Sequence, residues 1–113
     1  MDGYLGNRIM VKIGRHYFFI KKEDIHFIRS ERNYSRIICD QRSYVVKRSL
    51  LSLEEILDTD NFLRINRSTI VNVNKINEMK SNGESDYVVV MSNNETLPWG
   101  RRYRENLIRL IRV

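Results

Sequence analysis

The stretch FLRINRSTIVNVNKI, residues 62–76, alternates apolar side chains with a dense set of polar ones. It predicts two short strands, the first ending near Ile65 and the second starting near Thr69. Asn66-Arg67-Ser68 would form the turn between them, because asparagine and serine favour turns. Arginine and asparagine also carry paired hydrogen-bonding groups that match base edges in a DNA major groove. The turn is therefore a candidate nucleic-acid contact.

The asparagines of this stretch also have a purely structural explanation. Asn66, Asn72 and Asn74 could each hydrogen-bond the local backbone, and the pattern alone favours that role for each of them. Arg67 differs, because a guanidinium at the tip of a turn is suited to a guanine edge or to a phosphate.

A second polar cluster, Trp99-Gly100-Arg101-Arg102-Tyr103-Arg104, lies near the end of the chain. Gly100 would let the backbone approach a neighbour closely, while the arginines could either bind DNA or simply cover a surface. A third polar and aromatic loop, ERNYSR, occupies residues 31–36. Aromatic side chains among basic ones also suit stacking on single-stranded bases, so these residues leave duplex and single strand both open.

Most of the remaining chain has the pattern of short strands separated by turns. Alternating or apolar runs occupy residues 8–13, 16–20, 25–28, 34–39, 43–46, 87–91 and 95–97. Asn82-Gly83 is suited to a tight hairpin turn before residues 87–91. This spacing is typical of an antiparallel, mainly β domain.

Two segments have helical spacing instead. The apolar positions are Leu50, Leu53, Ile56 and Leu57 in residues 49–57, and Tyr103, Leu107, Leu110 and Ile111 at the C-terminus. The first segment predicts a short amphipathic helix that covers a sheet, with Ser52-x-x-Glu55 resembling a capping box. The second predicts a terminal helix packed on the body.

The 113 residues are enough for one domain, 1–113, with its own core. The net charge is +6 and the isoelectric point is about 9.7. Residues 1–60 carry eleven Lys and Arg against nine Asp and Glu, and residues 61–113 carry nine against five. The basic excess therefore lies mostly in the half with the first two polar clusters, although charge alone does not decide for a nucleic-acid partner.

The sequence gives little support for catalysis or for metal binding. His16 and His26 lie in strand patterns without an acidic or cysteine partner at metal-ligand spacing. Glu54-Glu55 is better explained as a solvated helix face than as an acid/base pair. Cys39, the one cysteine, sits in an apolar run that favours a buried thiol in a reducing compartment. We therefore expect no enzymatic activity, cofactor or metal, and we expect a cytoplasmic protein because signal-peptide and membrane-length apolar patterns are missing.

Together these motifs resemble the LytTR-type DNA-binding domain, the output module of many bacterial response regulators. The resemblance covers nearly the whole chain, and its most specific part is Phe-x-Arg-Ile-x-Arg-Ser-x-Ile-Val-Asn, residues 62–72. The other matching parts are Asp24-Ile25-x-Phe27-Ile28, Asn33-Tyr34, Leu50-x-x-Leu53-Glu54-x-x-Leu57, and Arg101-Arg102-Tyr103 with Leu107.

The resemblance implies about ten short antiparallel strands in layered small sheets, and loops that enter two successive major grooves of DNA. By position, it implies base contacts from Asn66, Arg67, Arg101, Arg102 and Ser35. It implies further contacts from the neighbours of Ser35, which are Asn33, Tyr34 and Arg36. We place Arg64 and Asn72 among the supporting residues, and from their chemistry we expect Ser68 and Lys75 to contact phosphates.

Two positions depart from the pattern that is usual in the family. Asn66 stands where the family usually has histidine, and Gly100 stands where it usually has serine. Asparagine would favour adenine through its paired edge. Glycine lacks a hydroxyl that could bond a phosphate or cap the terminal helix. Both changes leave the arginines in place.

The expected function is sequence-specific binding of double-stranded DNA, as the output domain of a longer bacterial transcriptional regulator. Paired direct repeats and a homodimer on DNA are expected, and neither a membrane nor a small-molecule substrate is expected as a partner. Two alternatives stay open. A single-strand or RNA-binding β domain would use Tyr34, Tyr87, Trp99 and Tyr103, and a protein-interaction module would carry its positive charge incidentally.

Overall fold

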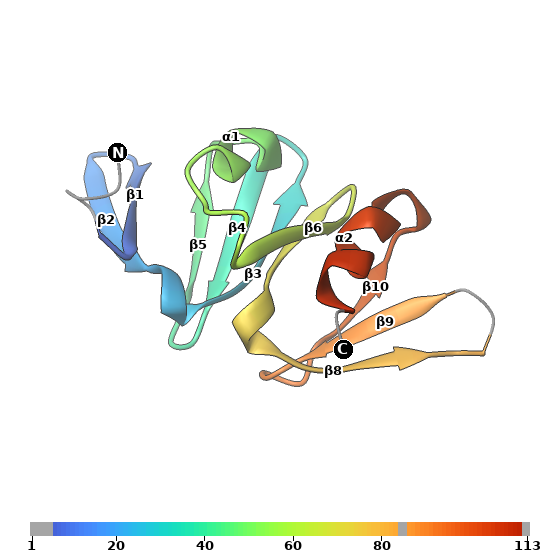
Figure 1. Cartoon of the computed structure of the whole chain (residues 1–113). Coiled ribbons are helices and arrows are strands. Elements are labelled where there is room, and N and C mark those ends of the chain that lie inside the picture. The colour runs from blue at the N-terminus through green and yellow to red at the C-terminus, as the bar shows by residue number, and fades with distance from the viewer. Residues whose placement is uncertain (1–5, 84–85, 112–113) are drawn as a thin grey trace.

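The computed structural model describes residues 6–83 and 86–111, and its largest part is a five-stranded antiparallel sheet (Figure 1). The strands are β3 (Ile25–Glu31), β4 (Tyr34–Cys39), β5 (Ser43–Val46), β6 (Phe62–Asn66) and β7 (Thr69–Asn72). Their order in the sheet is β5-β4-β3-β7-β6. The β3–β4 and β6–β7 hairpins therefore lie side by side, because β3 pairs with both β4 and β7.

Two smaller sheets flank the large one. They are formed by β1 (Arg8–Ile13) with β2 (His16–Lys21), and by β8 (Ile76–Ser81), β9 (Tyr87–Met91) and β10 (Thr96–Trp99). The helices are α1 (Leu50–Glu54) and α2 (Arg104–Leu110). Single 3-10 turns are η1 (Lys22–Asp24), η2 (Val73–Lys75) and η3 (Arg101–Tyr103). The described residues thus confirm the mainly β architecture of ten strands and two helices.

Strand β3 forms a wall shared by two hydrophobic cores. Ile25 and Ile28 belong to the core beneath β1, β2 and α1, whereas Phe27 belongs to the core that Trp99 and Leu107 help to build. Residues three apart in a regular strand face opposite sides. The register shift between Ile25 and Phe27 removes that conflict and lets Ile25 and Ile28 face the same core.

Several predicted strand bounds are confirmed, since residues 8–13, 34–39, 43–46 and 87–91 form strands with those limits. The sequence pattern does not predict β8, because its side chains are mostly exposed and only Ile76 and Met79 are partly buried. The turn expected at Asn82-Gly83 is longer than two residues, since Ser81 pairs with Tyr87. Residues 84 and 85 of that connection lie outside the described residues.

Helix α1 begins at a different cap from the one predicted. Its N-cap is Ser49, whose Oγ accepts a hydrogen bond from the Ser52 backbone nitrogen at 3.1 Å. Ser52 Oγ in turn donates to the Ser49 carbonyl at 2.9 Å. The predicted capping box at Ser52-x-x-Glu55 is therefore wrong, because Ser52 lies in the first turn and Glu55 is the C-cap.

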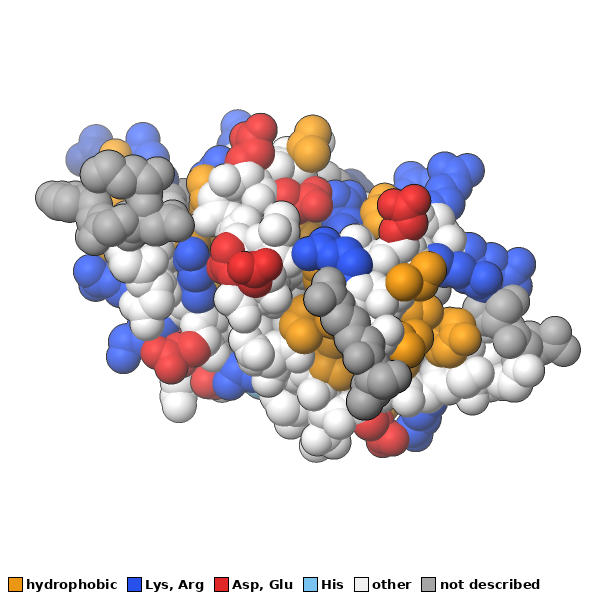
Figure 2. All heavy atoms as spheres, in the orientation of Figure 1, with side chains coloured by type: hydrophobic (Ala, Val, Ile, Leu, Met, Phe, Trp, Pro, Cys, Tyr) orange, Lys and Arg blue, Asp and Glu red, His pale blue; other side chains and the backbone are white. Residues whose placement is uncertain are grey.

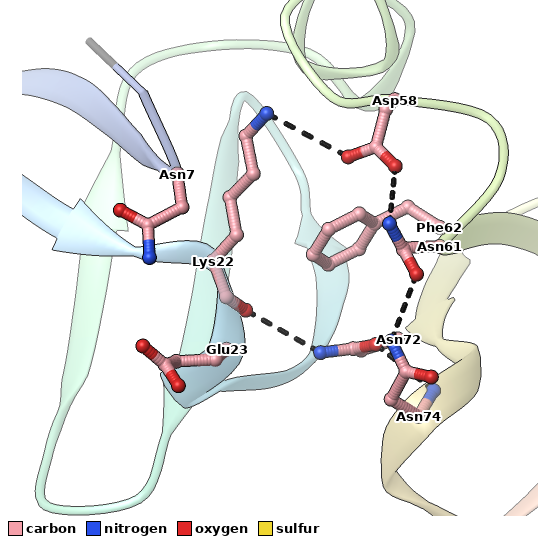
Figure 3. A pocket seen from close by; sticks show the side chains of 8 residues that line it. All are labelled: Asn7, Lys22, Glu23, Asp58, Asn61, Phe62, Asn72 and Asn74. Carbon is pink, nitrogen blue, oxygen red and sulfur yellow. Dashed lines mark hydrogen bonds and ion pairs between the residues drawn. The ribbon is translucent and has the colours of Figure 1, made fainter.

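Asn72 fastens the end of β7 to η1 (Figure 3). Its Nδ2 donates to the carbonyl of Ile25 at 2.8 Å and to that of Lys22 at 3.3 Å, and its Oδ1 accepts from the Asn74 backbone nitrogen at 3.0 Å. The side chain is only 2% exposed. Its contacts continue around a pocket of about 420 Å³ through Asn74, Asn61, Asp58 and Lys22. Asn72 thus supports the fold from inside the protein.

Asn72→Ala should lower the free energy of unfolding by about 1–3 kcal/mol, because buried carbonyls lose their donor. Urea denaturation followed by circular dichroism measures the change. The matched control is Asn33→Ala at an exposed turn position, where a change within about 0.5 kcal/mol is expected. Equal stabilities of the two variants would contradict this role of Asn72.

Candidate nucleic-acid interface

Three turns meet at one end of the five-stranded sheet. Arg32, Asn33 and Tyr34 from the β3–β4 turn and Arg67 from the β6–β7 turn line one groove of about 400 Å³. The third turn starts at residue 100 and is hydrogen-bonded to the end of β6. We call residues 32–34, 66–68 and 100–102 the three-turn face. The fold therefore brings together the three polar clusters that are separate in the sequence.

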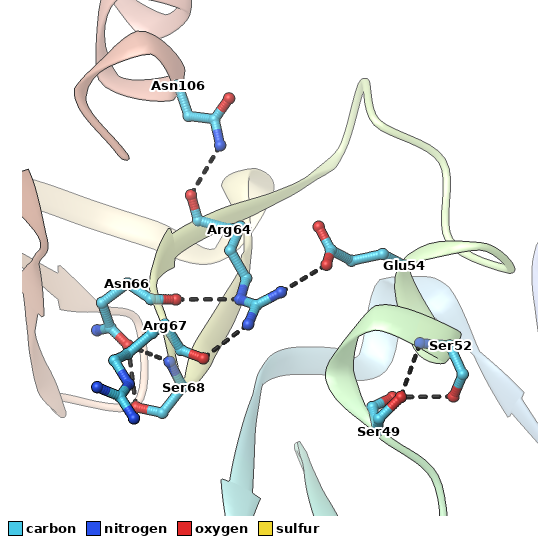
Figure 4. A network of polar contacts seen from close by, with 8 residues as sticks. All are labelled: Ser49, Ser52, Glu54, Arg64, Asn66, Arg67, Ser68 and Asn106. Carbon is cyan, nitrogen blue, oxygen red and sulfur yellow. Dashed lines mark hydrogen bonds and ion pairs between the residues drawn. The ribbon is translucent and has the colours of Figure 1, made fainter. Parts of the chain in front are cut away.

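Arg64 holds the β6–β7 turn in shape (Figure 4). Its Nε donates to the Asn66 carbonyl at 3.0 Å, its Nη2 to the Arg67 carbonyl at 2.6 Å, and its Nη1 to Glu54 Oε1 on α1 at 2.6 Å. The Arg64 carbonyl accepts from Asn106 Nδ2 on α2 at 2.8 Å. Because its guanidinium is used in these contacts, Arg64 positions the turn and does not project toward a partner.

The Asn66 side chain also shapes the turn from within. Its Oδ1 accepts from the backbone nitrogen and the hydroxyl of Ser68, at 2.9 and 3.0 Å, and its Nδ2 donates to the Pro98 carbonyl at 2.8 Å. Both acceptor positions of the amide are thereby occupied. The structural role that the sequence favours for this asparagine is present, and a paired contact with adenine would require these bonds to open.

Gly100 lets the third turn pack directly on the second. Its backbone nitrogen donates to the Ile65 carbonyl at 2.6 Å. A Cβ at this position would lie 3.2 Å from the Asn66 Cβ and 3.4 Å from the Ile65 carbonyl oxygen. This close approach explains the glycine, and it joins η3 to the β6–β7 turn.

The exposed arginines of the three-turn face differ in their contacts. Arg67 and Arg102 are exposed, and among the described residues neither side chain forms a hydrogen bond or an ion pair. Arg101 is 71% exposed, but its Nε and Nη2 donate to Asp86 Oδ1 at 3.2 and 3.0 Å. Figure 2 shows basic side chains projecting from the end of the molecule that carries β10 and α2. The face therefore presents cationic ends to an anionic partner.

Residues of the first turn fall into exposed and buried groups. Asn33 and Tyr34 are exposed, with Tyr34 at 45%. Ser35 is fully buried, and its hydroxyl donates to the Arg48 carbonyl at 2.6 Å. Arg36 donates to Glu31 at 2.7 and 3.2 Å, and this pairing lowers the pKa of Glu31 below its usual range. Ser35 is thus placed to fix the strand and not to reach a base, and Arg36 is already paired.

The expected phosphate contact Lys75 lies apart from the three-turn face, in η2 beyond the opposite end of β7. Its Nζ is 3.8 Å from Asp40 Oδ1. The same carboxylate lies 2.5 Å from Nε2 of the buried His26, whose Nδ1 is 3.2 Å from Ser92 Oγ. His26 therefore has an acidic partner that the sequence spacing does not reveal.

The model of the LytTr DNA-binding domain family matches residues 15–112, which include all three turns. This chain belongs to the LytTr DNA-binding domain family. The predicted family is thus confirmed, and the three-turn face of this LytTr domain lies within the residues that match the family.

The curated relatives of this chain are considerably longer than the region that it matches. Sensory transduction protein LytT of Bacillus subtilis is 24% identical over 107 residues, which are 95% of this chain and 44% of LytT. Sensory transduction protein LytR of Streptococcus mutans is 31% identical over 88 residues, or 78% of this chain and 36% of LytR. The domain thus spans less than half the length of these curated relatives.

A solved LytTr DNA-binding domain from Bacillus cereus has the same fold. It matches with a TM-score of 0.81 at 22% identity, over 95% of this chain and 98% of that one. Such low identity with such close geometry means that the arrangement of sheets tolerates extensive side-chain replacement.

Two residues close to the face are not singled out by the sequence. Leu51 is 69% exposed and lines the groove, and Asp86 pairs with Arg101. The Asp86 contact spans 15 residues of sequence and leaves no local pattern.

Side chains suited to metal binding or to thiol chemistry are not assembled in the described part of the chain. Residues 6–83 and 86–111 contain no group of three His, Cys, Asp or Glu that could hold a metal ion. The helices in the same ranges are too short or too polar to cross a bilayer. Burial, and then the nearby Asp24 and Asp40 carboxylates, raise the pKa of the Cys39 thiol to about 12.

Arg64→Met should lower the free energy of unfolding by about 2 kcal/mol, because Glu54 and two turn carbonyls lose their common donor. Arg67→Met removes a neighbouring arginine without such contacts and should change stability by less than about 0.5 kcal/mol. Urea unfolding of both variants gives the comparison. Similar losses in both would mean that Arg64 does not hold the turn.

Native Cys39 should react with iodoacetamide at pH 8 roughly a hundredfold more slowly than the same thiol in the unfolded chain, because a raised pKa removes thiolate. Mass spectrometry of samples taken over time, with and without urea, measures both rates. Comparable rates in the two states would show an accessible, ionisable thiol.

Proposed function

We propose that this LytTr domain binds double-stranded DNA sequence-specifically, by placing the three-turn face in successive major grooves. The observation that carries the proposal is the exposed Arg67, which has no ion-pair partner among the described residues and lies on a turn whose backbone Arg64 holds. Arg101 and Arg102 follow a second turn anchored to the same strand, β6. Turns that are ordered before binding lose less entropy on binding, so their arginines can discriminate between base edges more strongly.

The side chains of the face and of its neighbouring strand residues divide into three proposed roles. Arg67 and Arg101 read base edges, and Arg102 binds beside Arg101 at a base or a phosphate. Asn33, Tyr34 and Ser68 contact the DNA backbone. Asn66, Ser35, Arg36 and Arg64 position the turns through their internal hydrogen bonds. Asn72 and Lys75 lie at the opposite end of β7 and have no part in this contact.

The burial of the aromatic residues favours duplex over single-stranded nucleic acid. A single-strand site needs exposed rings on which bases can stack. Trp99 is only 6% exposed, and its Nε1 donates to the Tyr103 carbonyl at 2.7 Å. Tyr87 and Tyr103 are partly buried against the second core. Of the four aromatic residues considered for stacking, Tyr34 alone is exposed, which is too few for a stacking surface.

The domain acts, in this proposal, as the output part of a longer bacterial transcriptional regulator. The curated relatives are named sensory transduction proteins and are more than twice as long as the matched region. A single face of three turns covers a short site, so two copies on paired direct repeats would supply the affinity that one copy lacks. Such copies form a homodimer on the DNA.

Arg67→Ala and Arg101→Ala should each weaken binding to the preferred duplex by about 1–3 kcal/mol and relax the preference at one base pair. The duplex is first selected from a random pool, and dissociation constants are then measured by fluorescence anisotropy. The matched control is Arg15→Ala in the β1–β2 turn, outside the three-turn face, which should leave the base preference unchanged.

The same titrations at two salt concentrations separate the contact types. Affinity for any duplex should fall steeply as salt rises, because phosphate contacts release counterions. Equal weakening of Arg67→Ala on preferred and random duplexes would make Arg67 a phosphate contact only. Tighter binding to a single strand or to RNA than to duplex would overturn the proposal.

A further inference from the structure

Asp86 holds one edge of the Arg101 guanidinium. Arg101 Nε and Nη2 both donate to Asp86 Oδ1, at 3.2 and 3.0 Å. The carbonyl of Asp86 accepts from the Asn82 backbone nitrogen at 3.2 Å, which closes the connection between β8 and β9. The two side chains are 71% and 49% exposed, so their pairing adds little to folding stability.

A guanidinium has two edges that can each form paired hydrogen bonds. One edge is Nε with Nη2, and the other is Nη1 with Nη2. Asp86 occupies the first edge of Arg101, and within residues 6–83 and 86–111 Arg101 Nη1 has no partner. The second edge is thereby left for the paired acceptors of guanine, O6 and N7.

Arg101 is fixed at its backbone as well as at its guanidinium. Gly100 donates to the Ile65 carbonyl at 2.6 Å, and the Gly100 carbonyl accepts from the Tyr103 nitrogen at 3.0 Å. Among the described residues, neither Arg67 nor Arg102 forms an ion pair with a carboxylate, unlike Arg101. We infer that Asp86 is a positioning residue that sets the base selectivity of Arg101. This inference rests on the function proposed above.

The carboxylate has two effects on DNA binding, and they have opposite signs. Its negative charge repels phosphates and weakens binding to every sequence. Its hydrogen bonds orient Arg101 and strengthen discrimination at one base pair. Removing a charge alone therefore predicts tighter binding with an unchanged base preference. Removing the orientation predicts a weaker preference at one position, whatever happens to the mean affinity.

The test compares Asp86→Ala with the unmodified protein on the duplex selected by the latter, and on every single-base-pair variant of it. Fluorescence anisotropy at one fixed salt concentration gives the dissociation constants. Asp86→Ala should lose roughly five- to tenfold of discrimination at one base pair and keep the preferences elsewhere. The matched charge control is Glu78→Ala, because Glu78 is exposed on β8. It should keep every preference.

A second comparison ties the effect to Arg101. Arg101→Ala should lose its preference at the same base pair, and the double variant Asp86→Ala with Arg101→Ala should lose no more there. Additive losses, or losses at different base pairs, would overturn the inference. Equal urea midpoints across the variants check that all of them fold.

The outcomes also distinguish this inference from the function on which it rests. Failure of the unmodified protein to enrich any sequence from the random duplex pool would refute the proposed function, and the inference with it. Enrichment together with an unchanged preference profile in Asp86→Ala would overturn the role of Asp86 alone.

Discussion

The guanidinium of Arg64 is the interaction on which the three-turn face depends. Its side chain is 18% exposed, and a cation so placed must be paired to offset its lost hydration. Glu54 supplies the charge, while the carbonyls of Asn66 and Arg67 supply the remaining acceptors. A turn of three polar residues has no apolar core of its own. Arg64 instead stabilises the turn by linking it to Glu54 on α1, and the hydrogen bond from Asn106 links the same strand to α2.

Net charge alone would treat all twenty basic residues of the chain alike, but their surroundings give them different functions. The guanidinium groups of Arg64 and Arg36 donate hydrogen bonds to carboxylates within the fold, and Arg64 also donates to backbone carbonyls. Arg101 donates hydrogen bonds to Asp86 from one edge of its guanidinium, whereas Arg67 donates none among the described residues. A cation whose donors are already used gains little from a new anion. The arginines that remain available to an anionic partner are therefore distinguished by their contacts and not by their residue type.

Whether a feature can be predicted from the sequence depends on how far apart its interacting residues lie in the chain. Strands such as residues 34–39 and 87–91 are predicted with the observed bounds. The reason is that the apolar residues of a buried or half-buried strand form a recognisable pattern among residues that are adjacent in the sequence. The partners of Asn72 lie 47 and 50 residues away, and the Pro98 carbonyl that Asn66 bonds lies 32 residues away. Ser35 is buried under a carbonyl 13 residues later. Such long-range contacts leave no pattern among neighbouring residues. The sequence therefore locates the three turns, but it does not distinguish the side chains that hold the turns together from those that project into solvent.

Asn66 and Gly100, the two positions that we expected to depart from the family pattern, are neighbours in the structure. A Cβ on residue 100 would stand 3.2 Å from the Asn66 Cβ, closer than most such contacts in proteins, so the glycine makes room for the asparagine turn to lie against η3. In that position Asn66 bonds Ser68 on one side and the Pro98 carbonyl on the other, thereby joining the second turn to the third. The pair therefore acts as one unit. Its contacts join the second turn to the third, and the backbone that carries Arg67 and Arg101 is thereby held on both sides of this joint.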